Sequence, residues 1–239
     1  MDNALLFKPL YEELFNSVKD VSNELWPFFP QQGSNWDLSE HRMLFIGKAT
    51  NGWVTINRDV DLLFDPNEEG RIVNRDDEMD WVLDGWGQNI EGKYNTKKSS
   101  FWRVIKRITI SNEKSCSDDN WASYISWSNL YKISFESGNP SSPLQKLQRE
   151  VCSKILDLEI QILKPKNIIF FTSGWEWFYL YHRKSLVTQS QNRTTTSWGK
   201  NRKYESYALD LNGINCIISC HPERKPEFAH AEAICSLIK

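Results

Sequence analysis

Gly47 and His221 each stand where an apolar run of the chain ends in a polar turn. The first run, residues 43–46, leads into a glycine-bearing turn at 47–53, and the second, residues 214–219, leads into the turn that contains His221. Ligands bind at the edge of an α/β sheet where the carboxyl ends of its parallel strands lie, so both turns are expected there. The two turns are therefore predicted to converge on one pocket.

The turn that follows Gly47 has the composition of an anion- or base-binding loop. Backbone N–H groups around Gly47 and Lys48 suit a phosphate, a carboxylate or the polar edge of a base. The turn has neither the Gly-Lys-Ser/Thr of a P-loop nor the spaced glycines of a dinucleotide-binding fold, so no nucleotide cofactor is expected. An ordinary strand–helix turn is the alternative interpretation.

Other polar side chains at predicted strand ends could complete such a site. His221 can donate a hydrogen bond or a proton to a ligand oxygen, and Arg224 and Lys225 add cations that suit phosphate groups. Asn129 offers a donor and an acceptor that can pair with the polar edge of a pyrimidine. Each of these residues taken alone is better explained as a surface turn or strand-end residue. The other histidines are expected to be structural or exposed: His41, His182 and His230.

Composition limits the classes of function. The net charge of −2 gives no global case for nucleic acid, but residues 59–84 are strongly acidic and the last hundred residues are net positive. If the protein has a DNA-facing surface, the C-terminal half is therefore expected to form it. The five cysteines form no C-x-x-C pair, which predicts no metal or iron–sulfur site and favours reduced thiols in a cytoplasmic protein. No signal peptide or membrane span is expected, because no apolar run approaches 18 residues.

Hydrophobic periodicity predicts the elements that position these residues. Strands are predicted at 43–46, 124–129, 167–172 and 214–219, and helices at about 4–25, from Ser100, from about 141 to 163, at about 174–181 and at 226–238. The apolar stripe of the long helix is predicted to consist of Leu144, Leu147, Val151, Ile155, Leu158 and Ile162. Residues 183–207 are polar and are expected to form an exposed loop or hairpin.

The alternation of strands and helices predicts an α/β fold with a parallel sheet. The expected architecture is a three-layer α/β/α domain around a central four-stranded, mostly parallel sheet, with residues 1–239 as a single domain. Residues of about 54–98 are expected to form an acidic insertion or lid with one or two short helices, because their periodicity is weak.

Four segments of the chain resemble the uracil-DNA glycosylase superfamily. They are, in chain order, residues 45–53, residues 100–105, residues 152–174 and His221-Pro222. In that family they correspond to a strand ending in glycine and a polar turn, a Phe-Trp helix, a long helix with a Lys-Pro break before the third strand, and the His-Pro that opens the last motif. The resemblance covers most of residues 40–235.

The resemblance implies a reaction and a set of roles. Such enzymes extrude a damaged base from DNA and hydrolyse its N-glycosidic bond. Asn129 would recognise the base, His221 would stabilise charge on the base carbonyl, and Trp53 is the nearest candidate to stack on the base. Backbone at Gly47 and Lys48 would border the pocket. The resemblance further implies DNA, single- or double-stranded, as partner of a monomer without a cofactor.

One position departs from the pattern of that family. The family usually has Asp, Glu or Asn two residues after the first glycine to position the attacking water, and this chain has Ala49 there. Asn51 could take that role in a shifted turn, and Asp59 or Asp61 could take it if the lid folds back. Two alternatives therefore stay open beside the glycosylase: a non-catalytic protein that binds nucleic acid or a free base, and a hydrolase or transferase on another α/β fold.

Overall fold

The computed structural model describes all residues except 1–2, 74–78, 90–93 and 174–192. The chain divides into two compact units, each built from three separate segments. The first unit comprises residues 1–30, 47–76 and 128–164, and the second comprises residues 31–46, 77–127 and 165–239. The helix predicted at about 174–181 and the early part of the loop predicted at 183–207 lie outside the described residues.

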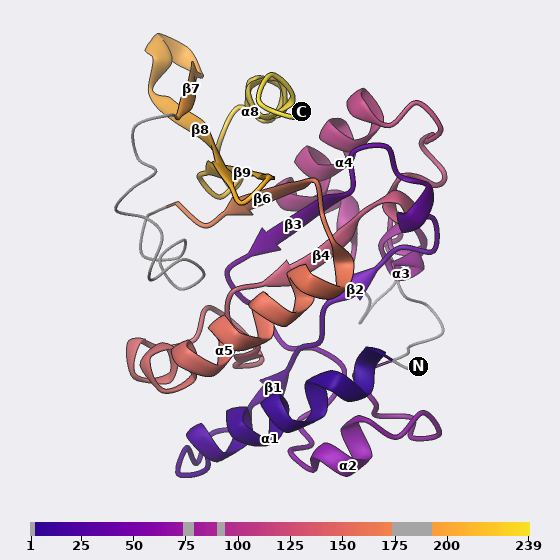
Figure 1. Ribbon diagram of the computed structural model, residues 1–239, viewed down its shortest axis with the longest axis vertical. Coiled ribbons are helices and arrows are strands. Elements are labelled where there is room, and N and C mark those ends of the chain that lie inside the picture. Colours follow the sequence, from indigo (N-terminus) through magenta and orange to yellow (C-terminus); the bar gives the residue numbers. More distant parts are fainter. Residues whose placement is uncertain (1–2, 74–78, 90–93, 174–192) are drawn as a thin grey trace. The chain divides into compact units, whose positions relative to one another are not determined.

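A seven-stranded mixed sheet organises the second unit (Figure 1). Its strands follow the order β2-β4-β3-β6-β9-β8-β7. Their bounds are Gln31–Gln32 for β2, Met43–Gly47 for β3, Ser126–Asn129 for β4, Asn167–Phe171 for β6, Thr194–Trp198 for β7, Tyr204–Leu211 for β8 and Ile214–Ser219 for β9. The predicted α/β class is confirmed, and the four predicted strands are present as β3, β4, β6 and β9.

The strands β3, β6 and β9 are parallel neighbours. Ile46 pairs with Phe170, and Phe170 with Ile218, so the carboxyl ends of all three strands lie along the same edge of the sheet. Every residue of β3 and β6 is buried, as expected of strands covered on both faces. The continuous apolar runs from which these strands were predicted follow from that burial.

The sheet is wider than the predicted four strands because antiparallel strands extend it at both ends. β2 pairs antiparallel with β4, while β8 pairs antiparallel with β9 and with β7. Asn212 and Gly213 join β8 to β9 and both have positive φ, the backbone of a tight hairpin turn. Of the two alternatives for residues 183–207, an exposed loop or a hairpin, the described part forms the hairpin, in which β7 pairs with the start of β8.

Helices of the second unit include one pair that packs together. The α-helices are α3 (Asp80–Asp84), α4 (Ser100–Asn112) and α8 (Glu227–Cys235), and short 3₁₀ turns are η2 (Trp36–Leu38), η3 (Thr96–Lys98), η4 (Trp121–Tyr124) and η5 (Lys200–Arg202). α4 packs against α8, where Arg103 Nε and Nη2 donate to the carboxylate of Glu227 at 2.5–3.1 Å. This contact ties the Phe-Trp helix to the C-terminal helix.

The first unit is built mainly from helices. Its elements are η1 (Asn3–Phe7), α1 (Lys8–Ser17), α2 (Val60–Leu63), α5 (Ser142–Leu163) and the two-residue antiparallel pair β1 (Trp26–Pro27) and β5 (Ile133–Ser134). α5 has its predicted bounds: the Ser141 hydroxyl accepts from Leu144 N at the start, and Lys164, with a φ of +47°, ends it. The N-terminal helix is shorter than the predicted 4–25, since α1 ends at Ser17. Val18 and Leu25, which were expected on its apolar face, are buried beyond its end.

The buried face of α5 differs from the predicted apolar stripe. Leu147 is 46% exposed, whereas Gln148 and Glu159 are fully buried. Gln148 and Glu159 can be buried on this face because both have polar partners in residues 128–133. No helix in the described part of the chain is long and apolar enough to span a bilayer.

Candidate functional site

The turn after β3 is tied along its length to the segment that follows β4. Leu130 N donates to Gly47 O and Tyr131 N donates to Lys48 O, both at 3.0 Å, and Gly52 N donates to Phe135 O at 2.9 Å. The predicted base-binding turn is therefore held by backbone hydrogen bonds to residues 130–135 of the same unit.

The side chains of that turn have distinct environments. Thr50 is buried with its Oγ1 3.0 Å from Ser134 Oγ, while Asn51 is exposed. Gly52 has a φ of +67°, a conformation that a side chain would strain. Trp53 is half-buried, and its ring meets that of Phe28 edge-on at 5.3 Å. Asn51 is thus the polar side chain that the turn exposes, while Trp53 already has an aromatic contact inside the unit.

Asn129 is the buried polar residue at the end of β4. The residue is 1% exposed, and its side-chain nitrogen has no hydrogen-bond partner among the described residues. Its backbone oxygen accepts from Lys132 Nζ at 2.5 Å. A buried amide donor without a partner costs about 1–3 kcal/mol, and a ligand that accepted a hydrogen bond from this nitrogen would remove that cost.

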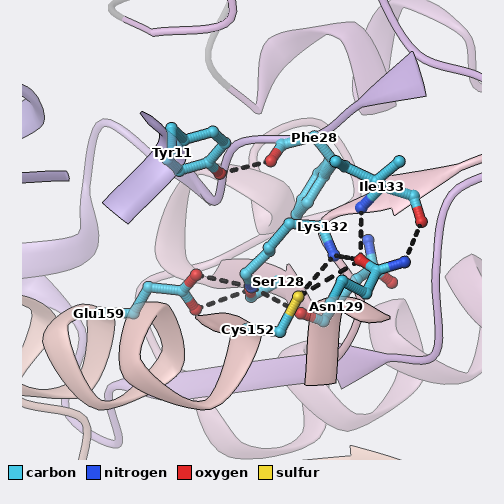
Figure 2. A network of polar contacts seen from close by, with 9 residues as sticks. Tyr11, Phe28, Ser128, Asn129, Lys132, Ile133, Cys152 and Glu159 are labelled. Atoms are coloured by element: carbon cyan, nitrogen blue, oxygen red, sulfur yellow. Dashed lines mark hydrogen bonds and ion pairs between the residues drawn. The ribbon is translucent and has the colours of Figure 1, made fainter. Parts of the chain in front are cut away.

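A fully buried ion pair lies beside Asn129 (Figure 2). Lys132 Nζ is 2.6 Å from Glu159 Oε1, and both side chains have no exposed surface. Ser128 Oγ accepts from Lys132 Nζ and donates to Glu159 Oε2, each at 2.7 Å. Burial raises the pKa of the Glu159 carboxyl above its usual range, against the attraction of Lys132. The ammonium group is therefore shared by a carboxylate, a hydroxyl and the backbone of Asn129.

A second side chain of α5 holds the other end of this segment. Gln148 Oε1 accepts from the N–H groups of Lys132 and Ile133 at 3.1 and 2.9 Å, and Gln148 Nε2 donates to Ile133 O at 2.9 Å. Cys152 lies next to Gln148, and burial raises the pKa of its thiol to about 12. Glu159 and Gln148 therefore anchor residues 128–133 to α5 at two points.

The acidic residues considered for water activation have other contacts. Asp59 is the N-cap of α2, where its carboxylate accepts from Asp61 N and Leu62 N. Asp61 lies 2.5 Å from Lys8 Nζ. These contacts give neither aspartate the role of the acidic residue that the family has at the position of Ala49. Asn51, the other polar side chain of this unit that was predicted to position water, is exposed.

His221 follows β9 in the second unit. Its backbone N–H donates to Ser173 Oγ at 3.1 Å, and its Nδ1 accepts from Glu223 N at 3.2 Å. The ring stacks on Phe101 with centroids 6.0 Å apart, and burial lowers the pKa of the imidazole below its usual value. A neutral ring whose Nδ1 accepts carries its proton on Nε2, so His221 presents an N–H donor from an exposed turn.

Arg224 and Lys225 continue the turn after His221. The side chain of Arg224 is 90% exposed and lies 3.6 Å from the Glu223 carboxylate. Lys225 Nζ donates to Glu223 O at 3.1 Å and lies 5.5 Å from the centroid of the Tyr204 ring. Both predicted phosphate-binding residues are thus available on the surface of the second unit.

His230 has buried partners that the sequence did not indicate. Trp198 Nε1 donates to Ser206 Oγ, which lies 2.7 Å from Ser219 Oγ, and Ser219 Oγ lies 2.7 Å from His230 Nε2. The Trp198 and His230 rings stack at 4.2 Å, and burial lowers the pKa of His230 to about 3. His230 is structural, as expected, and it joins α8 to the strands β7, β8 and β9.

The candidate residues thus fall into two groups, each within one unit. Gly47, Lys48, Asn51, Trp53 and Asn129 belong to the first unit, and His221, Arg224 and Lys225 belong to the second. No sequence pattern indicated that Lys132 and Glu159 are buried, since lysine and glutamate are almost always exposed. In the described part of the chain, no group of three or more His, Cys, Asp or Glu side chains could hold a metal ion. Comparison with protein-family models and with curated proteins found no match to this chain.

Proposed function

We propose that this protein is a uracil-DNA glycosylase-like enzyme, a monomer that binds a damaged or deaminated base extruded from DNA and hydrolyses its N-glycosidic bond. We also propose that the chain forms a three-layer α/β/α domain around the strands β4, β3, β6 and β9. The strand order and the parallel register of β3, β6 and β9 support it.

The observation that carries the proposal is the buried side-chain nitrogen of Asn129, which has no hydrogen-bond partner among the residues that the structure describes. A base presents a carbonyl acceptor beside an N–H donor, and an asparagine side chain can pair with both. Asn129 is buried and lacks a protein partner for its nitrogen among the described residues, so a base would remove the cost of that lone donor. Lys132 supports the role, because its Nζ donates to the backbone oxygen of the same residue, and Glu159 holds that ammonium group in place.

The chemistry requires a donor for the leaving base. In hydrolysis the bond between C1′ of the sugar and the base nitrogen breaks, the oxygen of water bonds to C1′, and negative charge develops on the base before it takes a proton. His221 is proposed to donate its Nε2–H to the base carbonyl oxygen. The lowered pKa of His221 supports a neutral donor at neutral pH. Asn51 is proposed to position the water, and Arg224 and Lys225 to contact phosphate groups.

A second candidate function is binding of nucleic acid or a free base without catalysis. It is favoured by Ala49 at the position of the usual water-positioning residue and by the contacts of Asp59 and Asp61, which cap α2 and pair with Lys8. Base recognition by Asn129 would be unchanged in that case. The two candidates differ only in whether the bound base is released.

The test is base release from oligonucleotides that contain uracil, hypoxanthine, xanthine or a thymine mismatch, alongside binding to the same oligonucleotides. Release of one base, lost in both Asn129→Ala and His221→Ala, is the expected result. Binding of one modified base without release, lost in Asn129→Ala, would establish the second candidate instead. Neither release nor preferential binding for any of the four bases would reject both.

A further inference from the structure

Two basic turns of the second unit touch one another. One turn, residues 199–203, joins β7 to β8, and the other, residues 221–226, joins β9 to α8. A Cβ atom added to Gly199 would lie 2.8 Å from Cδ2 of Tyr204 and 3.6 Å from Cγ of Pro226. The first turn therefore packs directly against the end of the second.

The two turns concentrate positive charge on the surface. Together they carry five cationic side chains and one carboxylate, Glu223. The cationic residues are Lys200, Arg202, Lys203, Arg224 and Lys225, here called the basic cluster. Lys225 is half-buried and the other four are exposed. The local excess of positive charge contrasts with the net charge of −2 of the whole chain.

Tyr204 fixes lysines from both turns. Lys203 Nζ lies 5.7 Å and Lys225 Nζ 5.5 Å from the centroid of its ring, within cation–π range. The Tyr204 ring is itself packed against Trp198 at 4.8 Å. One supported aromatic ring therefore holds two ammonium groups that come from different turns, which lowers the entropy that they lose on binding an anion.

We propose that the basic cluster binds the phosphate backbone of nucleic acid. Separate cations on two adjoining turns match the regular spacing of phosphodiester charges, and neutralising several phosphates releases their counterions. The cluster extends the proposed contacts of Arg224 and Lys225 to Lys200, Arg202 and Lys203. The inference rests on the proposed DNA partner, but it requires neither a damaged base nor base release.

The test is fluorescence anisotropy of the full chain with a fluorescein-labelled, undamaged oligonucleotide of about 16 nucleotides, single-stranded and duplex, over a salt series. The triple variant Lys203→Gln/Arg224→Gln/Lys225→Gln is expected to bind at least tenfold more weakly. For the single strand, the slope of log affinity against log salt should fall by about 2 if three phosphate contacts are lost. Because Lys203 and Arg224 are exposed and Lys225 is half-buried in a surface turn, the far-UV circular dichroism should not change.

The matched control is Lys97→Gln/Lys98→Gln/Lys114→Gln, three exposed lysines of the same unit outside the cluster. It makes the same change in net charge and should keep nearly wild-type affinity and salt slope. If the control variant and the cluster variant lost the same affinity for the oligonucleotide, the proposal would be overturned, because the change in net charge alone would explain the loss. Wild-type binding by the cluster variant would overturn it as well.

An anionic membrane surface is the alternative binding partner for the basic cluster. Phe228, near the second turn in the chain, is 63% exposed and could insert into a bilayer. Vesicles of phosphatidylcholine and phosphatidylserine serve as the probe, with Phe228→Ala as the variant that weakens insertion. Vesicle binding by the wild type without oligonucleotide binding would overturn the proposal. Undamaged-oligonucleotide binding that depends on the cluster supports it, even if no base is ever released.

Discussion

Lys132 Nζ lies 2.6 Å from Glu159 Oε1, and neither residue has exposed surface (Figure 2). The pair joins the segment after β4 to the helix α5 and places a donor on the backbone oxygen of Asn129. A buried ion pair adds little net stability relative to apolar residues, because both ions lose their hydration. Its cost is consistent with a role in holding the candidate base-recognition residue.

Removing only the lysine should destabilise the protein strongly. Lys132→Met leaves Glu159 buried without its cation, which is expected to lower the free energy of unfolding by about 3–5 kcal/mol. The double variant Lys132→Met/Glu159→Leu should recover most of that loss. Urea unfolding measures both values.

A matched control for that pair is the exposed ion pair of Lys154 and Glu13, which also reaches α5. Its atoms are 2.5 Å apart, but the side chains are 44% and 45% exposed. Lys154→Met should cost less than about 1 kcal/mol, since water screens such pairs. A similar loss in Lys132→Met and Lys154→Met would contradict the importance of burial.

The polar side chain of Asn129 is expected to lower the free energy of unfolding of the ligand-free protein and to be needed for binding a modified base. Asn129→Leu removes a buried donor that has no partner among the described residues, so the free energy of unfolding should rise by about 1 kcal/mol. Binding of a modified base should be lost in the same variant. Urea unfolding and oligonucleotide binding give the two readouts.

Asn215 provides the comparison for Asn129. It is also buried, but its side-chain nitrogen donates to Asn167 Oδ1 and Leu237 O, both at 2.8 Å. Asn215→Leu should therefore be destabilised, because it leaves those acceptors without their donor. If Asn129→Leu lost as much stability as Asn215→Leu, the Asn129 amide would have a structural partner.

His230 should make the protein sensitive to acid. Its pKa is about 3 in the folded protein, against an ordinary value of 6.5, because burial disfavours the imidazolium. Between these values the unfolded state binds the proton and the folded state does not, so stability falls as the pH falls below 6.5. The loss between pH 7 and pH 5 should be about 2 kcal/mol.

Thermal unfolding at pH 7 and pH 5 tests this prediction. His230→Gln should lose less stability than the wild type on acidification, although its melting temperature at pH 7 should be lower, because the stacking on Trp198 is lost. His41→Gln changes a histidine outside this network and should keep the wild-type response. An unchanged pH dependence in His230→Gln would show that another group controls it.

Gly199 should not tolerate a side chain. It has φ of 78° and ψ of 175°, a region that is essentially restricted to glycine, and a Cβ would meet the Tyr204 ring at 2.8 Å. Gly199→Ala should cost about 1–3 kcal/mol from backbone strain, with a further loss from the contact. Gly138→Ala has the same φ of +78° but open space, so it should cost less in thermal unfolding. Equal losses would mean that Tyr204 moves aside freely.

The sequence predicted the central elements because their signals are local. β3, β6 and β9 are buried apolar runs that end at a glycine or a polar turn, and α5 has a serine cap and an early proline. For β7 and the start of β8 the sequence left a loop and a hairpin open, since β7 is a largely exposed strand with polar residues and its pattern resembles a loop. The Asn212-Gly213 hairpin turn was the signal that could have identified β8.

The sequence by itself determined which segments form the parallel strands and the long helix, because burial on both faces or on one face leaves a periodic pattern. The tertiary structure alone decided that Lys132, Glu159 and Gln148 are buried and that, within the described part of the chain, the side-chain nitrogen of Asn129 has no acceptor. A charged or amide side chain is stable in a core only when a partner comes within hydrogen-bonding distance. That partner lies on an element distant in the chain, where no local pattern can indicate it.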